Sequence, residues 1–368
     1  MEPVEISAGR LHLRPWQESD EDAVYEACQD PEIQRWTRVP SPYTREDARE
    51  HTLRSQQGWQ EGGAARFAVL DATSGGLLGT VLLFDIADGD AEVGYWCAPW
   101  ARGQGVMSEA VATVCRWGFG ELGLARIEWA AGVGNWASLA VAQKCGFTFE
   151  STSRMGLVTR GERHDGWWAA LLATDEMVDR RPPRPPTLTD GVVTLRPWSL
   201  ADAPEVARAC DDPETARWLP VPSPYAVSDA ETWISSTFNG WAFGDPLSLA
   251  VTDASTGAVL GSVALSEGSW RSGRISVGYW TAPWGRGRGA ASRATTLLTA
   301  WAFAVLGVDR VELLADVDNA ASQRVAEKAG FHREGTAKSA RRDRSGAPRD
   351  FVQFSRVRSS TEGGPLPG

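Results

Sequence analysis

The chain has 368 residues, a formal net charge of -10 and 42% hydrophobic residues, a length that accommodates two or three domains of about 150 residues, each with its own core. The acidic balance argues against a nucleic-acid groove as the main function, and neither a membrane-spanning apolar run nor a secretion leader is found. Five cysteines without Cys-x-x-Cys spacing predict a reduced, cytoplasmic protein with no metal site.

The first half predicts an alternating α/β unit with a strand-rich middle. Cap signals and turn clusters delimit its elements, and the short spacing of the middle strands favours an antiparallel meander. In chain order we expect a strand at 4–14, helices at 18–29 and 45–60, strands at 65–70, 77–86 and 92–97, a helix at 109–119, a strand at 125–131, a helix at 137–145 and two final strands around 160–162.

The second half repeats the first. Leu13-Arg14-Pro15-Trp16 returns as Leu195-Arg196-Pro197-Trp198, and the Val-Gly-Tyr-Trp strand of 93–96 returns at 277–280. The offset grows from 182 to 184 between these two motifs. A period this long indicates two whole domains and not a solenoid.

A proline-rich segment separates the halves. Arg180-Arg181-Pro182-Pro183-Arg184-Pro185-Pro186 can form neither a helix nor a central strand. It is typical of a semi-rigid spacer. We therefore expect an N-terminal domain at 1–177, a linker at 178–190, a C-terminal domain at 191–357 and a disordered tail at 358–368.

Each half carries a glycine-rich loop between a strand and a helix, at 99–105 and 283–289. Backbone amides at the start of a helix favour a phosphate, and glycine lets a ligand oxygen approach the main chain closely. The spacing is neither that of a P-loop nor that of a dinucleotide fingerprint. The loops are therefore candidate phosphate sites of another class.

The fuller loop strings point to a family. Arg102-x-x-Gly105-x-Met107 and Arg286-x-x-Gly289-x-Ala291 resemble the acetyl-coenzyme A loop of the GNAT N-acetyltransferase superfamily. The Leu-Arg-Pro-Trp, Gly-Tyr-Trp and Asn-x-x-Ser patterns resemble its ribosomal-protein-alanine (Rim-type) branch, over about residues 4–177 and 191–357. The resemblance implies two tandem α/β (α+β) domains, each a mixed twisted sheet flanked by helices, whose fourth and fifth strands splay apart.

The resemblance also implies acetyl-CoA (coenzyme A) as cofactor. Loop amides would hold its pyrophosphate, and the Asn and Ser beyond the next strand would lie near the thioester. The residues so assigned are Arg102, Gly103, Gln104, Gly105, Val106, Met107 and Asn135 in the first half, and Arg286, Gly287, Arg288, Gly289, Ala290, Ala291, Asn319 and Ser322 in the second. Asn135 is independently expected to cap a helix, a role compatible with ligand binding.

Direct acetyl transfer needs a neutral amine, and a carboxylate acting through water can remove the proton. Glu92 is the candidate base, because it lies two residues before Gly94 on the strand beside the proposed gap; an exposed strand-edge carboxylate is the alternative interpretation. Ser138 is the candidate donor to the leaving thiolate. Ala142 and Ala326 stand where many family members have a tyrosine.

The two copies differ at acidic positions. Glu92 becomes Ser276 and Glu109 becomes Arg293, while Ala291 matches the family loop better than its counterpart in the first half. We expect the first half to carry out catalysis. The second half is expected to bind CoA weakly or to serve as a scaffold and substrate wall.

The acceptor is constrained only loosely. Trp129, Trp136, Trp167 and Trp168 occur in the first half alone and are candidates for stacking on a cationic amine. A small cationic or antibiotic-like amine is slightly favoured over a protein N-terminus such as that of a ribosomal protein. A rival function is a non-catalytic acyl-CoA-binding or interaction module. No nucleic-acid or membrane partner is expected, and the oligomeric state stays open.

Overall fold

The computed structural model describes residues 1–243, 246–269, 272–343 and 346–359. Contacts within the chain divide it into Met1–Arg181, here domain 1, and Pro182–Gly368, domain 2. The division falls inside the segment predicted as a linker, whose extent stays a prediction. Of the predicted tail, 360–368 lies outside the described residues, whereas Arg358 forms an ion pair with Asp309 at 2.8 Å.

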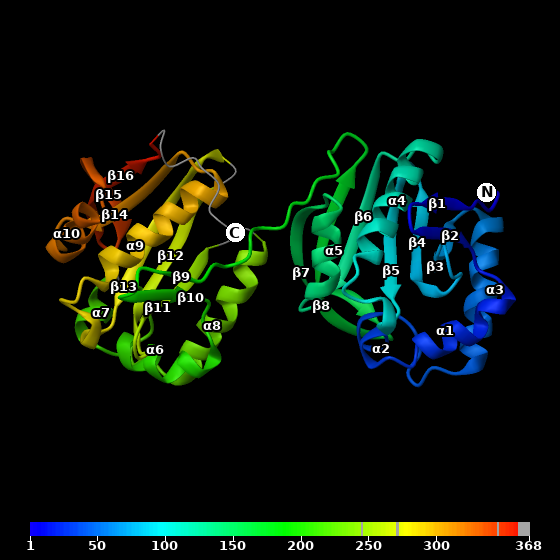
Figure 1. Ribbon diagram of the computed structural model, residues 1–368, viewed down its shortest axis with the longest axis horizontal. Coiled ribbons are helices and arrows are strands. Elements are labelled where there is room, and N and C mark those ends of the chain that lie inside the picture. The colour runs from blue at the N-terminus through cyan, green and yellow to red at the C-terminus, as the bar shows by residue number, and fades with distance from the viewer. Residues whose placement is uncertain (244–245, 270–271, 344–345, 360–368) are drawn as a thin grey trace. The chain divides into compact units, whose positions relative to one another are not determined.

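Domain 1 is an eight-stranded mixed sheet flanked by helices (Figure 1). The strand order is β1-β2-β3-β4-β5-β6-β8-β7, with β5 and β6 parallel and the other neighbours antiparallel. Helix α4 packs on β4 and β5, and α3 packs on β3. The elements are β1 Ile6–Ala8, β2 Leu11–Pro15, α1 Glu21–Ala27, α2 Pro31–Trp36, α3 Arg45–Glu61, β3 Ala64–Asp71, β4 Leu77–Ala87, β5 Asp90–Cys97, α4 Val106–Glu121, β6 Arg126–Gly132, α5 Trp136–Lys144, β7 Thr148–Thr159 and β8 Glu162–Leu172.

Domain 2 repeats this topology, with the strand order β9-β10-β11-β12-β13-β14-β16-β15. Helix α9 packs on β12 and β13 as α4 does on its counterparts. The elements are β9 Leu188–Thr189, β10 Val193–Arg196, α6 Ala203–Cys210, α7 Pro213–Trp218, α8 Val227–Ala242, β11 Leu247–Asp253, β12 Val259–Ser269, β13 Arg274–Thr281, α9 Ala290–Trp301, β14 Arg310–Asp316, α10 Ala320–Lys328, β15 His332–Arg342 and β16 Pro348–Val357. The predicted duplication of an α/β fold is confirmed.

Three sequence-based expectations need correction near the N-terminus. The strand expected at 4–14 is a hairpin of β1 and β2, because Gly9 turns the chain at a φ of +57°. The helix expected at 18–29 is a 3-10 turn at Glu18–Asp20 followed by the shorter α1. Helix α2 was not expected, although Asp30 caps it and Pro31 opens it, both of which are helix-start signals.

The repeated Leu-Arg-Pro-Trp motif has a structural role in both domains. In domain 1, Leu13 and Trp16 are buried, and the guanidinium of Arg14 donates two hydrogen bonds of 2.8 Å to Asp20. Arg196 and Asp202 form the same two-bond pair in domain 2. The motif therefore ties the second strand of the sheet to the first helical turn in each copy.

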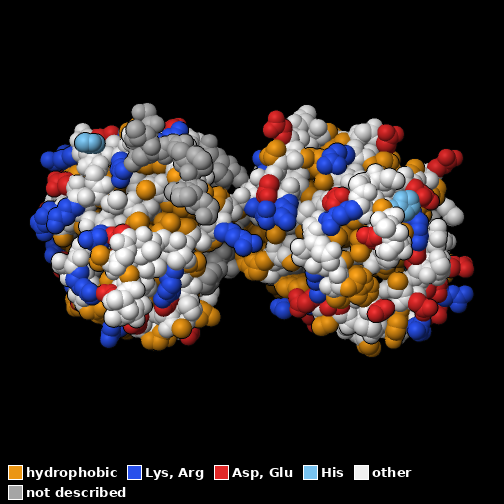
Figure 2. All heavy atoms as spheres, viewed as in Figure 1, with side chains coloured by type: hydrophobic (Ala, Val, Ile, Leu, Met, Phe, Trp, Pro, Cys, Tyr) orange, Lys and Arg blue, Asp and Glu red, His pale blue; other side chains and the backbone are white. Residues whose placement is uncertain are grey.

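Charged side chains on the surface are interspersed. In the view of Figure 2, basic and acidic groups alternate over the coloured atoms of each domain. Neighbours such as Arg54 and Glu50 on α3 form ion pairs. In the described parts of the chain, no helix is both long enough and apolar enough to cross a membrane.

Candidate active site

A cavity of about 1040 Å³ opens in domain 1 beside two strands that separate. β5 and β6 pair in parallel between Asp90–Glu92 and Arg126–Glu128, and the described residues show no pairing beyond that point. β13 and β14 diverge in the same way after Ser276 and Glu312. These strands correspond to the predicted fourth and fifth, so the expected splay is confirmed. Helices α2 and α3 and the first turns of α4 and α5 contribute to the wall in domain 1.

The glycine loop of domain 1 enters α4 at the cavity wall. Gly103 and Gly105 have φ values of +75° and +77°, a region that favours glycine. A Cβ added at Gly103 would meet no atom within 4 Å, so the main chain is open there. Gly105 is the N-cap of α4, whose first amides have no acceptor within the helix. This geometry is suited to binding a phosphate group.

The side chains of the loop are directed elsewhere. The guanidinium of Arg102 donates to Asp30 at 2.6 Å and lowers the pKa of that carboxyl. Gln104 donates through Nε2 to the carbonyl oxygen of Trp100 at 3.0 Å. Met107 is buried and lines the cavity. The predicted CoA-binding residues of this loop therefore offer main-chain groups rather than the Arg102 and Gln104 side chains.

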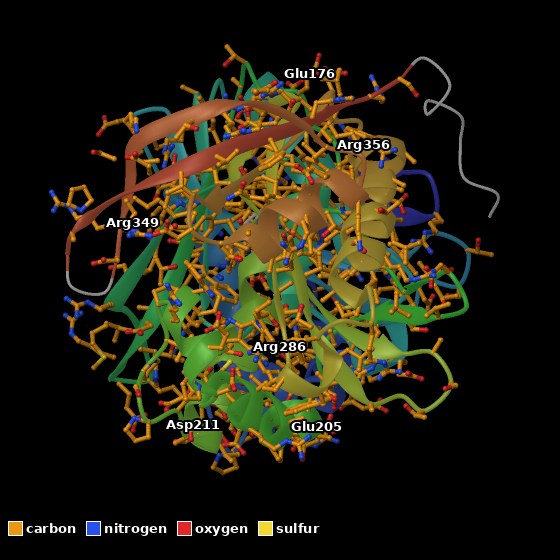
Figure 3. The ribbon with its side chains drawn as sticks, turned by 90° about the vertical axis from the view of Figure 1, so that its left-hand side faces the viewer. Glu176, Glu205, Asp211, Arg286, Arg349 and Arg356 are labelled. Atoms are coloured by element: carbon orange, nitrogen blue, oxygen red, sulfur yellow. The ribbon has the colours of Figure 1, made fainter. Side chains whose placement is uncertain are left out.

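The loop of domain 2 has the same conformation. Gly289 has a φ of +74° and caps α9. The guanidinium of Arg286, labelled in Figure 3, donates to Asp212 at 2.5 Å. Arg288 donates to Asp253 at 2.7 Å. The arginines of this copy are thus held by acidic partners, and its backbone cradle is retained.

Domain 1 has an acidic residue in the first turn of α4, whereas domain 2 has a basic one in the first turn of α9. The structure explains this difference. Glu109 accepts from Arg10 at 3.0 Å, and Arg10 also donates to the carbonyl oxygen of Gln104 at 2.6 Å. In domain 2 the charges are exchanged, because Arg293 pairs with Asp190 at 2.6 Å. The ion pair between the first hairpin and the helix is inverted and not lost. Glu109 therefore braces the loop of domain 1.

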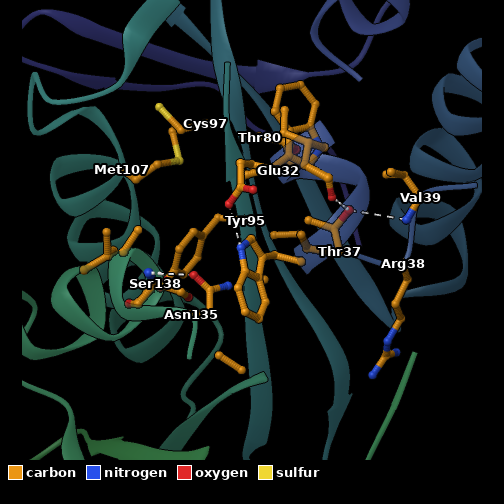
Figure 4. Close-up of a pocket in the computed structure, with 18 of the residues that line it drawn as sticks. Glu32, Thr37, Arg38, Val39, Thr80, Tyr95, Cys97, Met107, Asn135 and Ser138 are labelled. Carbon is orange, nitrogen blue, oxygen red and sulfur yellow. Dashed lines mark hydrogen bonds between the residues drawn. The ribbon is translucent and has the colours of Figure 1, made fainter. Parts of the chain in front are cut away.

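Asn135 and Ser138 lie together at the start of α5. The side-chain oxygen of Asn135 accepts from the amide of Ser138 at 3.2 Å (Figure 4). Asn319 caps α10 through the amide of Ser322 at 2.9 Å. The predicted capping role of Asn135 is confirmed, and Asn319 caps its helix in the same way. Asn135 and Ser138 also line the cavity, and their role toward a ligand stays a prediction.

Sequence reasoning missed Tyr95, which lies on β5 and meets Ser138. The Tyr95 hydroxyl donates to the carbonyl oxygen of Ser138 at 2.9 Å and accepts from the indole nitrogen of Trp129 at 2.9 Å. Its oxygen also lies 2.9 Å from the Ser138 hydroxyl. When Tyr95 instead directs its proton at this hydroxyl oxygen, Ser138 keeps its own proton free to donate into the cavity. The repeated Gly-Tyr-Trp pattern was the available signal, since Tyr279 meets Ser322 in the same way.

Glu92 lies at the point where β5 and β6 separate. Its carboxyl lines the cavity and is half-buried, so it is not an exposed strand-edge group. Burial raises the pKa of Glu92 to about 7, against a smaller lowering by Arg38. A carboxyl group titrating near neutrality in a cavity is suited to proton transfer.

The four tryptophans proposed for the acceptor have different positions. Trp129 and Trp136 line the cavity, whereas Trp167 and Trp168 are not among its lining residues. Trp129 is buried at 1% exposure and donates to Tyr95, which gives it a structural contact. Trp167 packs against Trp136 with ring centroids 4.6 Å apart. Contact with an acceptor stays a prediction for all four.

Domain 2 has different side chains at the positions that correspond to the lining of the domain 1 cavity. Ser276 stands in place of Glu92, and Trp233 stands in place of His51. The ring of Trp233 packs against those of Trp198 and Trp280, at centroid distances of 5.1 and 6.5 Å, and the latter two rings stack on each other. The region that carries polar groups in domain 1 is thus an aromatic cluster in domain 2.

Comparison with known proteins decides the family. The model of the acetyltransferase (GNAT) domain matches residues 10–148 and 193–332. The chain belongs to the GNAT acetyltransferase family. It holds two copies of the family's domain and is an N-acetyltransferase of this class. Among the described residues, no group of three or more His, Cys, Asp or Glu side chains could hold a metal ion.

Each of these relatives aligns with a stretch of the chain no longer than one domain. "Probable N-acetyltransferase YjcK" of Bacillus subtilis is 32% identical over 142 residues, covering 38% of this chain and 78% of that protein. "Putative ribosomal N-acetyltransferase YdaF" of Bacillus subtilis is 37% identical over 100 residues, covering 27% of this chain and 55% of that protein. The solved ribosomal-protein-S5-alanine acetyltransferase from Vibrio fischeri is 22% identical with a TM-score of 0.42, covering 49% of this chain and 100% of that one.

Proposed function

We propose that domain 1 transfers an acetyl group from acetyl-CoA to a primary amine by direct attack on the thioester. The observation that carries the proposal is the position of Glu92, a carboxyl group with a pKa near 7 in the cavity where β5 and β6 separate. In domain 2 this position holds Ser276. We therefore assign catalysis to domain 1 and a supporting role to domain 2.

The residues of domain 1 fit coenzyme A. The main chain at Gly103, which is open, and at Gly105, the N-cap of α4, would hold its pyrophosphate, and the gap between β5 and β6 would take the pantetheine arm. Bound acetyl-CoA supplies a thioester whose carbonyl carbon the amine attacks. The backbone of β5 beyond Glu92 borders the cavity, where its polar groups would polarise that carbonyl.

The remaining steps belong to side chains of the chain itself. Glu92 takes a proton from the acceptor ammonium, directly or through a water molecule. With the pKa of Glu92 near 7, this transfer costs about 1 kcal/mol from an α-amine and about 5 kcal/mol from a lysine amine. The carboxyl is therefore matched to an α-amine acceptor. Ser138, held by Tyr95, donates its hydroxyl proton toward the leaving thiolate.

The charge of the cavity does not favour the cationic acceptor expected from the sequence. Its lining includes six basic side chains and four acidic ones. The basic ones are Arg35, Arg38, Arg54, Arg66, Arg102 and Lys144, and the acidic ones are Glu32, Asp47, Glu50 and Glu92. Some of these side chains form ion pairs or belong to the proposed CoA-binding loop. The excess of basic over acidic side chains fits an acceptor that is not strongly cationic.

A protein N-terminus is the second candidate acceptor, since the name of the relative YdaF describes a ribosomal N-acetyltransferase. The test is acetyl-CoA turnover, followed by thiol release, with α-amino acids, peptides with free N-termini, polyamines and aminoglycosides. We expect turnover with α-amines. Tight CoA binding without turnover on any of these amines would instead support the non-catalytic module.

Replacing Ser138 with Ala tests its place in the reaction. We expect kcat to fall by about 100-fold, the lower end of the effect of a general acid, because a thiolate is a stable leaving group. The binding constant of CoA, measured by calorimetry, should change far less than kcat. An unchanged kcat would remove Ser138 as the proton donor.

A further inference from the structure

Three buried nitrogen atoms beside the cavity of domain 1 have no hydrogen-bond partner among the described residues. They are Nε1 of Trp16, Nε2 of His51 and Nε of Arg66. Among the described residues, no hydrogen bond or ion pair joins the Arg66 guanidinium to a carboxylate, and of the acidic groups only the charge of Asp85 acts on it, without such contact. Its neighbour Arg54 pairs with Glu50. Unpaired buried polar groups are costly. This cluster takes no part in the chemistry assigned above.

Strand register places these groups on the same face of the sheet as the proposed base. Pro15 pairs with Phe67, so the next residue, Trp16, lies beside Arg66. Arg66 pairs with Leu82, which pairs with Gly94. Because side chains alternate along a strand, Arg66 and Glu92 point to one face. Both line the cavity, as does His51.

Domain 2 shows that side chains at the positions of Trp16 and Arg66 can contact each other. There, Trp198 donates through Nε1 to the hydroxyl of Ser248 at 3.2 Å, and these residues correspond to Trp16 and Arg66. An arginine cannot accept a hydrogen bond, so the same indole in domain 1 lacks an acceptor. His51 joins the cluster through an edge contact with Trp16, at a centroid distance of 4.9 Å.

The cluster consists of groups that donate. Trp and Arg side chains are donors only, and a neutral histidine can donate through Nε2. Burial lowers the pKa of His51 to about 4 and also lowers that of Arg66, so near neutrality the site holds one cation beside a neutral ring. One planar guanidinium flanked by an indole N–H matches the two oxygens and single charge of a carboxylate.

We propose that Arg66, assisted by Trp16 and His51, binds a carboxylate group carried by the substrate of domain 1. This inference rests on the proposed function and names the substrate class of the same site. The carboxylate has two possible sources, the acceptor or the acyl chain of the donor. The position on β3, two strands away from β5, places the site on the α3 side of the cavity and makes the acceptor the preferred source.

The test compares substrates that differ in one carboxyl group. The acceptor arm uses α-amino acids and dipeptides, each with its carboxamide, and the donor arm uses succinyl-CoA against acetyl-CoA. If the acceptor carries the group, wild-type enzyme should prefer each acid over its amide by about 100-fold in kcat/KM, the effect of a charge-assisted hydrogen bond. If the acyl chain carries it, the preference should be for succinyl-CoA.

Arg66→Ser is the decisive variant, because Ser248 already occupies this position in domain 2. We expect it to reduce the preference to less than about threefold, chiefly by lowering kcat/KM for the acid. Arg49→Ser removes an equal charge from an exposed position of α3 and should keep the wild-type preference. If Arg66→Ser does not fold, Arg66→Lys provides the same comparison, with a weakened preference expected because a lysine cannot make the two-bond contact.

A binding measurement distinguishes the absence of a carboxylate site from the absence of acetyl transfer. Calorimetry measures binding of the free acids to the CoA-loaded enzyme without any turnover. Binding by the wild type that is lost in Arg66→Ser supports the carboxylate site even when no acetyl transfer is detected. No preference in either arm, or a preference and binding that survive in Arg66→Ser, would overturn it.

Discussion

Replacing Glu92 with Gln is expected to lower kcat/KM for an α-amine acceptor by about 100-fold to 10,000-fold, the range for loss of a general base. The wild-type rate should rise through about pH 7 as Glu92 loses its proton. The rate of the variant should not rise near pH 7 and should rise only where the acceptor amine loses its proton. Steady-state rates from pH 5.5 to 9 measure both effects.

The same substitution should stabilise the folded protein at high pH. The pKa of Glu92 is about 7 in the folded state against an ordinary value of 4.5. Between these values the folded state binds more protons than the unfolded state, so this carboxyl lowers stability as pH rises. Glu92→Gln should therefore unfold at a higher temperature than wild type at pH 8 and at a similar temperature at pH 4.

The matched control is Ser276→Ala, at the corresponding position of domain 2, which should leave both the pH profile and the turnover unchanged. Near-normal turnover in Glu92→Gln would exclude Glu92 as the base. A loss of turnover without the change in pH profile would instead indicate that the carboxyl acts by positioning the substrate.

Gly105→Glu is expected to abolish CoA binding by domain 1 and acetyl transfer. Gly105 has a φ of +77°, which a side chain adopts only with strain of roughly 1–2 kcal/mol. The new carboxylate would also stand at the helix start proposed for the pyrophosphate, where it repels a ligand of like charge. Calorimetry with CoA and thiol release with acetyl-CoA measure the two losses.

Gly120→Glu is the control for charge and residue type, because Gly120 lies at the other end of α4 and is exposed. Its CoA affinity should stay within about threefold of wild type. CoA binding that stays at wild-type affinity and stoichiometry in Gly105→Glu would contradict the loop as the pyrophosphate site of domain 1. A loss of turnover in Gly289→Glu would contradict the assignment of catalysis to domain 1.

Local signals explain which elements were predictable. The antiparallel meander of β3, β4 and β5 followed from turn clusters, and the cap at Asn135 followed from residue type. Helix α2 was missed although its Asp30-Pro31 start is visible, because only six residues follow the cap. Tyr95 was missed as a site residue because its partner Ser138 lies 43 positions away.

The sequence by itself determined the duplication, the alternating α/β order, the position of the glycine loops between a strand and a helix, and the family, because these depend on local patterns repeated at a long period. Tertiary structure decided what the loop side chains do, since Arg102 turns to Asp30 and Arg10 braces Glu109 across long separations. It also decided the surroundings of Glu92 and Arg66. Burial and unpaired donors depend on which strands and helices meet around one cavity, and no local pattern contains that information.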